Sequence, residues 1–212
     1  VVFVQAPAGY GKSMLVCRWL EIRGLSSHTA WLSVDPGADD PKHFVRYLAA
    51  ALEPIVPGIA TAAHLVLDAP EPDPVRALEL LFGMLQRDPN TSDNAPLLLV
   101  LDDLHQVDSP ALAPLMTLFL ERRPARLHVI LLGRRATYGP LTRLYAAEQV
   151  LDMSEADLRF QPHEMEAYLV QRGFPTLTPE ALARLAARTE GWIVALQLMT
   201  ASAGKPCDVD EL

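Results

Sequence analysis

The chain has 212 residues, half of them hydrophobic, and a formal net charge of −8 at pH 7. This size allows one well-buried core and part of a second, while the negative charge argues against a DNA-binding surface, because neutralising phosphates requires clustered Lys and Arg. No apolar run reaches the roughly eighteen residues that cross a bilayer, and no signal peptide with a basic start is present, so we expect a cytoplasmic protein without membrane contact.

The chain opens with a predicted strand, residues 1–5, that leads directly into a glycine-rich segment. Residues 6–13 read A-P-A-G-Y-G-K-S, which matches the phosphate-loop pattern G-x-x-x-x-G-K-[ST] except that Ala6 replaces the first glycine. In such a loop, backbone N–H groups turn toward the β-phosphate, the lysine bridges the β- and γ-phosphates, and the hydroxyl binds Mg²⁺. We therefore predict an ATP or ADP site, formed by Ala8, Gly9, Tyr10, Gly11, Lys12, Ser13 and Met14, with Ser13 as a metal ligand.

The loop is followed by a predicted helix over residues 14–22, whose start would add its positive end to the phosphate site. Cys17 lies inside this helix, far from Cys207, and we interpret both as buried free thiols. Because a natural chain rarely starts within a core strand and without Met, we expect this one to be a fragment that lacks the segment before its first strand.

The middle of the chain alternates apolar runs with helical patterns, which is typical of a parallel sheet covered on both faces. The predicted strands are residues 1–5, 29–34, 97–101, 127–132 and 149–153. Between them we predict helices over residues 41–52 and 74–86, each with a proline in its first turn. The Pro- and Ala-rich stretch 54–74 is expected to be a partly irregular insertion, and 86–96 a loop.

The third predicted strand ends in two carboxylates, Asp102 and Asp103. This is the Walker B arrangement, in which the first carboxylate holds Mg²⁺ opposite Ser13 and the second polarises the attacking water. The alternative is a strand that simply exits into an acidic, solvated loop. His105 follows in that loop, where its imidazole would sense the γ-phosphate or orient Asp103, or would be an ordinary loop histidine.

The next predicted strand, residues 127–132, ends in Gly133 and Arg134, at the same carboxyl edge of the sheet. Parallel α/β sheets bind ligands at that edge, and a planar guanidinium forms paired bonds to phosphate oxygens. Arg134 is therefore our candidate γ-phosphate sensor, with a surface arginine as the alternative. The predicted fold class is α/β, a P-loop NTPase of the ASCE/AAA-like type with a five-stranded parallel sheet and helices on both faces.

After residue 154 the strand signal ends and helical patterns take over. We predict helices over residues 162–172, 178–189 and 192–203, with Thr178 as a cap. The predicted domains are a nucleotide-binding domain over 1–153, a partial helical lid subdomain over 154–203 and a linker over 204–212. Trp31, Phe160 and Trp192 are expected in the core.

With these residues placed, the chain resembles the nucleotide-binding domain of the MalT-type signal-transduction ATPases, the large LuxR-type regulators within the STAND group of P-loop NTPases. The resemblance spans nearly the whole chain. Four motifs carry it: A-P-A-G-Y-G-K-S at 6–13, W-L-S-V-D at 31–35, L-V-L-D-D-L-H at 99–105 and G-W-x-x-A-L-Q-L at 191–198. Alanine at the head of the phosphate loop is usual in that family.

The resemblance implies a molecular switch. Similar proteins hold ADP in a closed monomer, exchange it for ATP when an inducer binds a distant domain, self-associate and activate transcription, with slow ATP hydrolysis as the reset. They contact DNA through a C-terminal helix-turn-helix that these residues do not include. The resemblance also implies that residues 160–169 and the segment Gly191-Trp192 form a lid over the nucleotide.

Two other functions remain open from the sequence. One is a non-hydrolysing, ADP-bound regulatory or scaffold module of a multidomain protein such as a protein kinase. The other is a small-molecule P-loop kinase, which would need a mobile basic lid that the sequence does not display. The intact Asp103 favours a slow ATPase over the scaffold.

Overall fold

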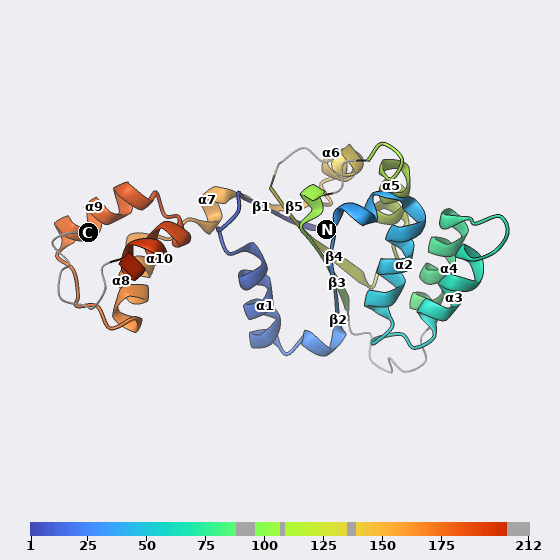
Figure 1. Ribbon diagram of the computed structural model, residues 1–212, viewed down its shortest axis with the longest axis horizontal. Coiled ribbons are helices and arrows are strands. Elements are labelled where there is room, and N and C mark those ends of the chain that lie inside the picture. Colours follow the sequence, from blue (N-terminus) through green and yellow to red (C-terminus); the bar gives the residue numbers. More distant parts are fainter. Residues whose placement is uncertain (88–95, 107–108, 135–138, 203–212) are drawn as a thin grey trace. The chain divides into compact units, whose positions relative to one another are not determined.

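The computed structural model describes residues 1–87, 96–106, 109–134 and 139–202, and the chain divides into two compact units. The sheet unit comprises Val1–Gln5 and Ser13–Asp152, and the helical unit comprises Ala6–Lys12 and Met153–Leu212. Figure 1 colours the chain from its blue start to its red end. The glycine-rich loop is thus grouped with the helical unit, although both of its neighbours in the chain belong to the sheet unit.

The sheet unit is organised around a five-stranded sheet with the order β2-β3-β4-β1-β5. Its strands are β1 (Val2–Gln5), β2 (Thr29–Ser33), β3 (Leu97–Asp102), β4 (Leu127–Gly133) and β5 (Leu151–Met153). The pairs β2–β3, β3–β4 and β4–β1 run parallel. At the far edge, the N–H of Leu151 donates to the carbonyl of Val1 at 2.9 Å. The predicted fold class is confirmed, with each strand within two residues of its expected bounds.

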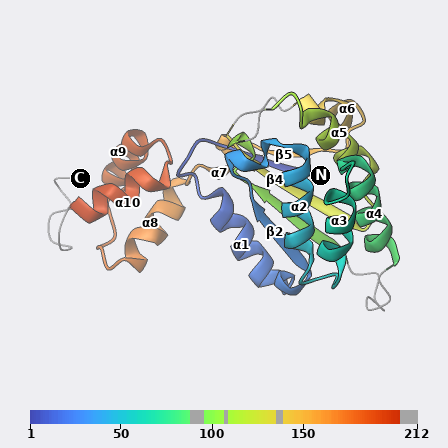
Figure 2. The same ribbon diagram turned by 45° about the vertical axis from the view of Figure 1, so that its right-hand side comes forward.

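The centre of the sheet is buried on both faces, as its sequence requires. All six residues of β3 are buried, which is typical of a continuous apolar strand in a parallel sheet covered by helices on both sides. Helix α1 (Lys12–Arg23) lies on one face, and α2 (Pro41–Leu52), α4 (Pro74–Arg87) and α5 (Ala113–Arg122) lie on the other (Figures 1 and 2). Helix α6 (Thr142–Ala146) precedes β5. No helix among the described residues is long and apolar enough to span a membrane.

Local signals account for α2, whose bounds coincide with the prediction. Asp40 caps the helix, because its carboxylate accepts hydrogen bonds from the N–H groups of Lys42 and His43 at 2.9 and 3.1 Å, and Pro41 occupies the first turn. Phe44 and Leu48 lie one turn apart and are both 1% exposed. The ring of Phe44 meets that of Phe119 from α5 edge to face, with centroids 6.3 Å apart.

The stretch 54–74 is more regular than we predicted, because it contains α3 (Ile59–Leu67). The helix packs between α2 and α4, and Ile59, Ala63 and Leu67 are fully buried along one stripe. Its start is capped by Glu53, whose carboxylate oxygens accept from the N–H groups of Gly58 and Ala60 at 2.8 and 2.7 Å. The Pro and Gly content before residue 59 concealed this helix from a sequence reading.

The helical unit has its own small core. Its helices are α7 (Glu155–Leu158), α8 (Pro162–Gln171), α9 (Pro179–Thr189) and α10 (Ile193–Ser202). Met165, Leu169, Leu185 and Leu196 are buried together. The hydroxyl of Thr178 accepts from the N–H of Ala181 at 3.3 Å and caps α9 as predicted. We find no strand after residue 153 within the part that the structure describes.

Some expectations about burial were wrong. Cys17 is exposed, because α1 buries only Val16 and Leu20 against the sheet and turns its Cys17 side outward. Trp31, Phe160 and Trp192 are half-buried. Most of the predicted loop 86–96, together with the linker 204–212 and Cys207, lies outside the described residues.

Candidate functional site

The carboxyl ends of three strands meet at one edge of the sheet. Gln5 at the end of β1 is in register with Gly133 at the end of β4, and Leu101 of β3 is in register with Leu131 of β4. Asp102 and Arg134 follow these positions along their strands. The structure therefore brings the acidic and basic residues predicted from the sequence to the same edge, where parallel α/β sheets bind ligands.

Ser13 and Asp102 are joined directly at this edge. The Ser13 hydroxyl donates a hydrogen bond of 2.7 Å to Oδ2 of Asp102, across a sequence separation of 89 residues. The other carboxylate oxygen accepts from the N–H of Asp103 at 2.9 Å. Asp102 is only 7% exposed, and a buried carboxylate requires such partners. Packing of α1 onto the sheet thus places the last residue of the glycine-rich segment against the tip of β3.

The donor set of this pair suits a magnesium ion. A hydroxyl and a carboxylate are hard oxygen ligands, and Mg²⁺ in nucleotide sites takes one or two protein ligands plus phosphates and water. Within the described ranges, no group of three or more His, Cys, Asp or Glu residues could hold a metal by itself.

Asp103 and His105 form a second cluster just past β3. Asp103 has a left-handed backbone, with φ of 57°, and its side chain is 55% exposed, whereas that of His105 is 17% exposed. Nδ1 of His105 lies 3.6 Å from Oδ1 of Asp103. This distance is within ion-pair range but longer than a hydrogen bond, so the imidazole lies beside a carboxylate that water still reaches. The left-handed conformation is uncommon outside glycine, and Asp tolerates it better than most residues.

Arg134 and Met14 are both exposed. Arg134 lies in the bend directly after β4, so its guanidinium is at the sheet edge and in contact with solvent. Met14, in the first turn of α1, is 73% exposed. Its predicted contribution to nucleotide binding therefore concerns its backbone position next to Ser13 rather than a packed side chain.

The glycine-rich loop, described within the helical unit, has two glycines in the left-handed region. Gly9 and Gly11 have φ of 83° and 76°, and left-handed residues of this kind occur in the backbone nests that bind anions. Lys12 Nζ donates to the carbonyls of Ala6 and Pro7 at 2.8 and 3.0 Å, so its ammonium is folded back over the loop. Ala6 is 3% exposed, and its methyl group is accommodated in the interior where a glycine was expected.

Gly9 has no space for a side chain. A Cβ on residue 9 would lie 2.7 Å from Nε1 of Trp192 and 2.8 Å from Cγ2 of Val194. The indole of Trp192 therefore packs directly on the backbone of the loop. This nitrogen is buried, and no hydrogen-bond partner for it is found among the described residues.

The sequence reading missed a cluster that holds the loop from α7. The hydroxyl of Tyr10 donates to Oε1 of Glu155 at 3.0 Å, and Nη2 of Arg159 donates to the same oxygen at 2.6 Å. The Glu–Arg spacing of four residues predicts a local ion pair on a helix. Nothing in the sequence reveals that this pair also meets Tyr10, 145 residues earlier.

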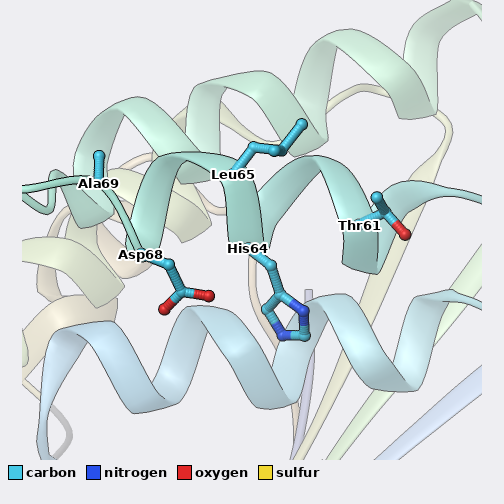
Figure 3. Close-up of a pocket in the computed structure, with 5 residues that line it drawn as sticks. All are labelled: Thr61, His64, Leu65, Asp68 and Ala69. Atoms are coloured by element: carbon cyan, nitrogen blue, oxygen red, sulfur yellow. The ribbon is translucent and has the colours of Figure 1, made fainter.

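A hollow elsewhere in the sheet unit contains none of the predicted residues. It has a volume of about 340 Å³ and is lined by Thr61, His64, Leu65, Asp68 and Ala69 along and just after α3 (Figure 3). Asp68 is already ion-paired with Arg46 of α2. The hollow is open and is lined by α3 and the residues just after it, so the sheet edge is the better candidate for the functional site.

Comparison with known proteins identifies sequence relatives over nearly the whole chain. The HTH-type transcriptional regulator MalT of Yersinia pestis (strain Pestoides F) is 29% identical over 208 residues, which are 97% of this chain and 22% of that protein. The regulator of the same name from Serratia proteamaculans (strain 568) is 32% identical over 206 residues. The chain thus spans about a fifth of the length of these relatives. No family model matches the chain.

A solved structure shares the fold. Cdc6p from Pyrobaculum aerophilum superimposes with a TM-score of 0.51 at 15% sequence identity, over 81% of this chain and 42% of that one. At this identity the likeness concerns the architecture alone, a five-stranded sheet with helices on both of its faces.

Proposed function

From the premise that this chain is MalT-type by its sequence, we propose that it is the nucleotide-binding regulatory module of a larger transcriptional regulator. The module binds ADP or ATP with Mg²⁺ and hydrolyses ATP slowly. The observation that carries this proposal is the 2.7 Å hydrogen bond between Ser13 and Asp102. In an incidental glycine-rich turn, the Ser13 hydroxyl would not be expected to bind the buried carboxylate of a strand 89 residues away.

Each residue has a chemical task in this proposal. Backbone N–H groups of the loop cradle the phosphates, and Lys12 exchanges its bonds to the Ala6 and Pro7 carbonyls for phosphate oxygens. Ser13 and Asp102 would hold a magnesium ion, which would neutralise phosphate charge. Asp103 accepts a proton, at its exposed carboxylate, from the water that attacks the γ-phosphate. His105 orients this carboxylate, and Arg134 binds the γ-phosphate.

The regulatory role is proposed for the whole protein of which such a module is part. ADP would hold a closed monomer, and ATP would permit self-association of the full-length regulator. DNA would be contacted by the helix-turn-helix that the names of the relatives specify, and not by these residues, whose net charge is −8.

Calorimetric titration of ADP tests the nucleotide site. We expect the wild type to bind ADP and Lys12→Ala to lose binding by about 10- to 100-fold, because a charge-assisted phosphate contact contributes about 1.5–3 kcal/mol and its loss leaves phosphate charge uncompensated. Lys42→Ala, at a half-buried position near the start of α2, is the matched control and should bind as the wild type does. Unchanged ADP affinity in Lys12→Ala would remove the site from this loop.

A further inference from the structure

The loop that we propose to hold phosphates is held in turn by side chains of the helical unit. Its residues Ala6–Lys12 are grouped with α7–α10 rather than with the sheet. Two contacts within this unit reach it, Trp192 on the backbone of Gly9 and Glu155 on the hydroxyl of Tyr10. The second contact is easier to test, because the hydroxyl oxygen of Tyr10 can be removed without changing the shape of the rest of the side chain.

The Tyr10–Glu155 contact is charge-assisted. The pKa of Glu155 is lowered below its ordinary value, first by the hydrogen bond from Arg159 and second by the hydrogen bond from Tyr10. Burial first, and then the bond to Glu155, raises the pKa of Tyr10. Both shifts keep the pair as a carboxylate and a protonated phenol at neutral pH, and such a pair makes a stronger bond than two neutral groups.

Tyr10 stands at the point where the loop has the greatest backbone freedom. It lies between Gly9 and Gly11, and glycine loses more conformational entropy on ordering than any other residue. An unanchored loop would lose that entropy on binding a ligand, whereas a loop already held in shape would not. The loop as seen has both glycines at positive φ, the conformation that a phosphate nest requires.

We propose that Glu155 is a positioning residue for the nucleotide site, which acts through the hydroxyl of Tyr10 to hold the phosphate loop ready for the diphosphate. The inference rests on the proposed function and extends it to a residue of α7. Arg159 supports Glu155 by fixing its charge and its rotamer. The helical unit thereby contributes to phosphate affinity through the shape of the loop.

Titration of Mg²⁺-ADP by calorimetry tests this inference. We expect Tyr10→Phe to weaken ADP binding at least about 10-fold, the lower end of the effect of losing one hydrogen bond to a charged group. Tyr145→Phe is the matched control, because Tyr145 also donates to a carboxylate, that of Asp152 at 2.7 Å, but within the sheet unit. It should leave ADP affinity unchanged.

Variants of Glu155 separate positioning from a general structural effect. Glu155→Ala should weaken ADP binding as Tyr10→Phe does, the double variant should be no weaker than either single one, and Glu155→Gln, which keeps an acceptor oxygen, should recover part of the loss. Additive losses, or equal affinity of Tyr10→Phe and wild type, would overturn the inference. Failure of the wild type to bind ADP would instead overturn the proposed function.

Discussion

At the scale of single residues, strained or crowded backbone occurs at two positions in the motifs noted in the sequence, Asp103 and Gly191. Asp103 has a left-handed conformation directly after the buried strand β3. Gly191 has φ of 77°, and a Cβ there would lie 2.8 Å from Cβ of Arg159 and 3.1 Å from the backbone nitrogen of Phe160. The positive φ and the close atoms of Arg159 and Phe160 thus give a packing reason for glycine at position 191.

Asp103→Asn should abolish turnover while preserving the fold. Asn tolerates the left-handed conformation as well as Asp does, but its amide cannot accept a proton from water at neutral pH. We expect single-turnover ATP cleavage to fall at least 100-fold, the typical contribution of general base catalysis, with ADP affinity within about 2-fold of wild type.

The measurement is phosphate release from pre-bound ATP, with urea unfolding as the control for folding. Cleavage at the wild-type rate in Asp103→Asn would exclude this carboxylate as the base. Transfer of the phosphate to a metabolite would point to the small-molecule kinase instead.

At the scale of elements, α3 shows how a charged side chain can cap the start of a helix that the composition of its segment does not predict. Glu53 lies after the end of α2, and both of its carboxylate oxygens accept backbone N–H groups at the start of α3. These bonds, from Gly58 first and Ala60 second, lower the pKa of Glu53 below its ordinary value of 4.5. Since the folded form binds the proton more weakly than the unfolded chain, the ionised group stabilises the fold above pH 4.5.

Glu53→Gln should therefore destabilise the protein at pH 7, because the amide offers one acceptor oxygen and no charge to the helix start. The difference from wild type should shrink as the pH falls below 4.5 and the wild-type carboxylate becomes protonated. Urea midpoints measured from pH 7 down to about pH 3.5 check this, with Glu71→Gln in the exposed segment before α4 as control. A difference independent of pH would contradict the capping role.

Most elements were predictable because their signals are local. Helix α2 carries its cap, its proline and its apolar stripe within thirteen consecutive residues, and β3 is a continuous apolar run bounded by carboxylates. Helix α3 was not predictable, since its cap comes from a residue six positions before Ile59 and its burial depends on packing between α2 and α4. The exposure of Cys17 likewise depends on which stripe of α1 meets the sheet.

At the scale of the whole molecule, the two units have cores of very different size. Among the described residues, the helical unit buries four in its core, whereas the core of the sheet unit extends from Phe3 to Leu144 and takes in residues of four strands and several helices. Buried apolar surface is the main source of stability, so local unfolding should begin in the helical unit.

Urea unfolding should therefore proceed in two transitions, with the helical unit first. A variant carrying Trp19→Phe and Trp31→Phe retains Trp192 as its single tryptophan, and its fluorescence should change before the far-UV signal of the sheet unit. ADP should raise the first midpoint, because a ligand stabilises the unit that binds it and the loop belongs to the helical unit. Coincident transitions that do not respond to ADP would contradict both expectations.

The sequence by itself determined where the five strands and most of the helices lie along the chain, the glycine-rich loop and the acidic end of β3, because each depends on residues close together in the chain. Only the tertiary structure decided which side chains meet. Ser13 reaches Asp102 across 89 residues, Tyr10 reaches Glu155 across 145, and Trp192 covers Gly9. Contacts of this kind arise from how the helices pack and how the strands are ordered, and a spacing pattern along the chain carries no information about either.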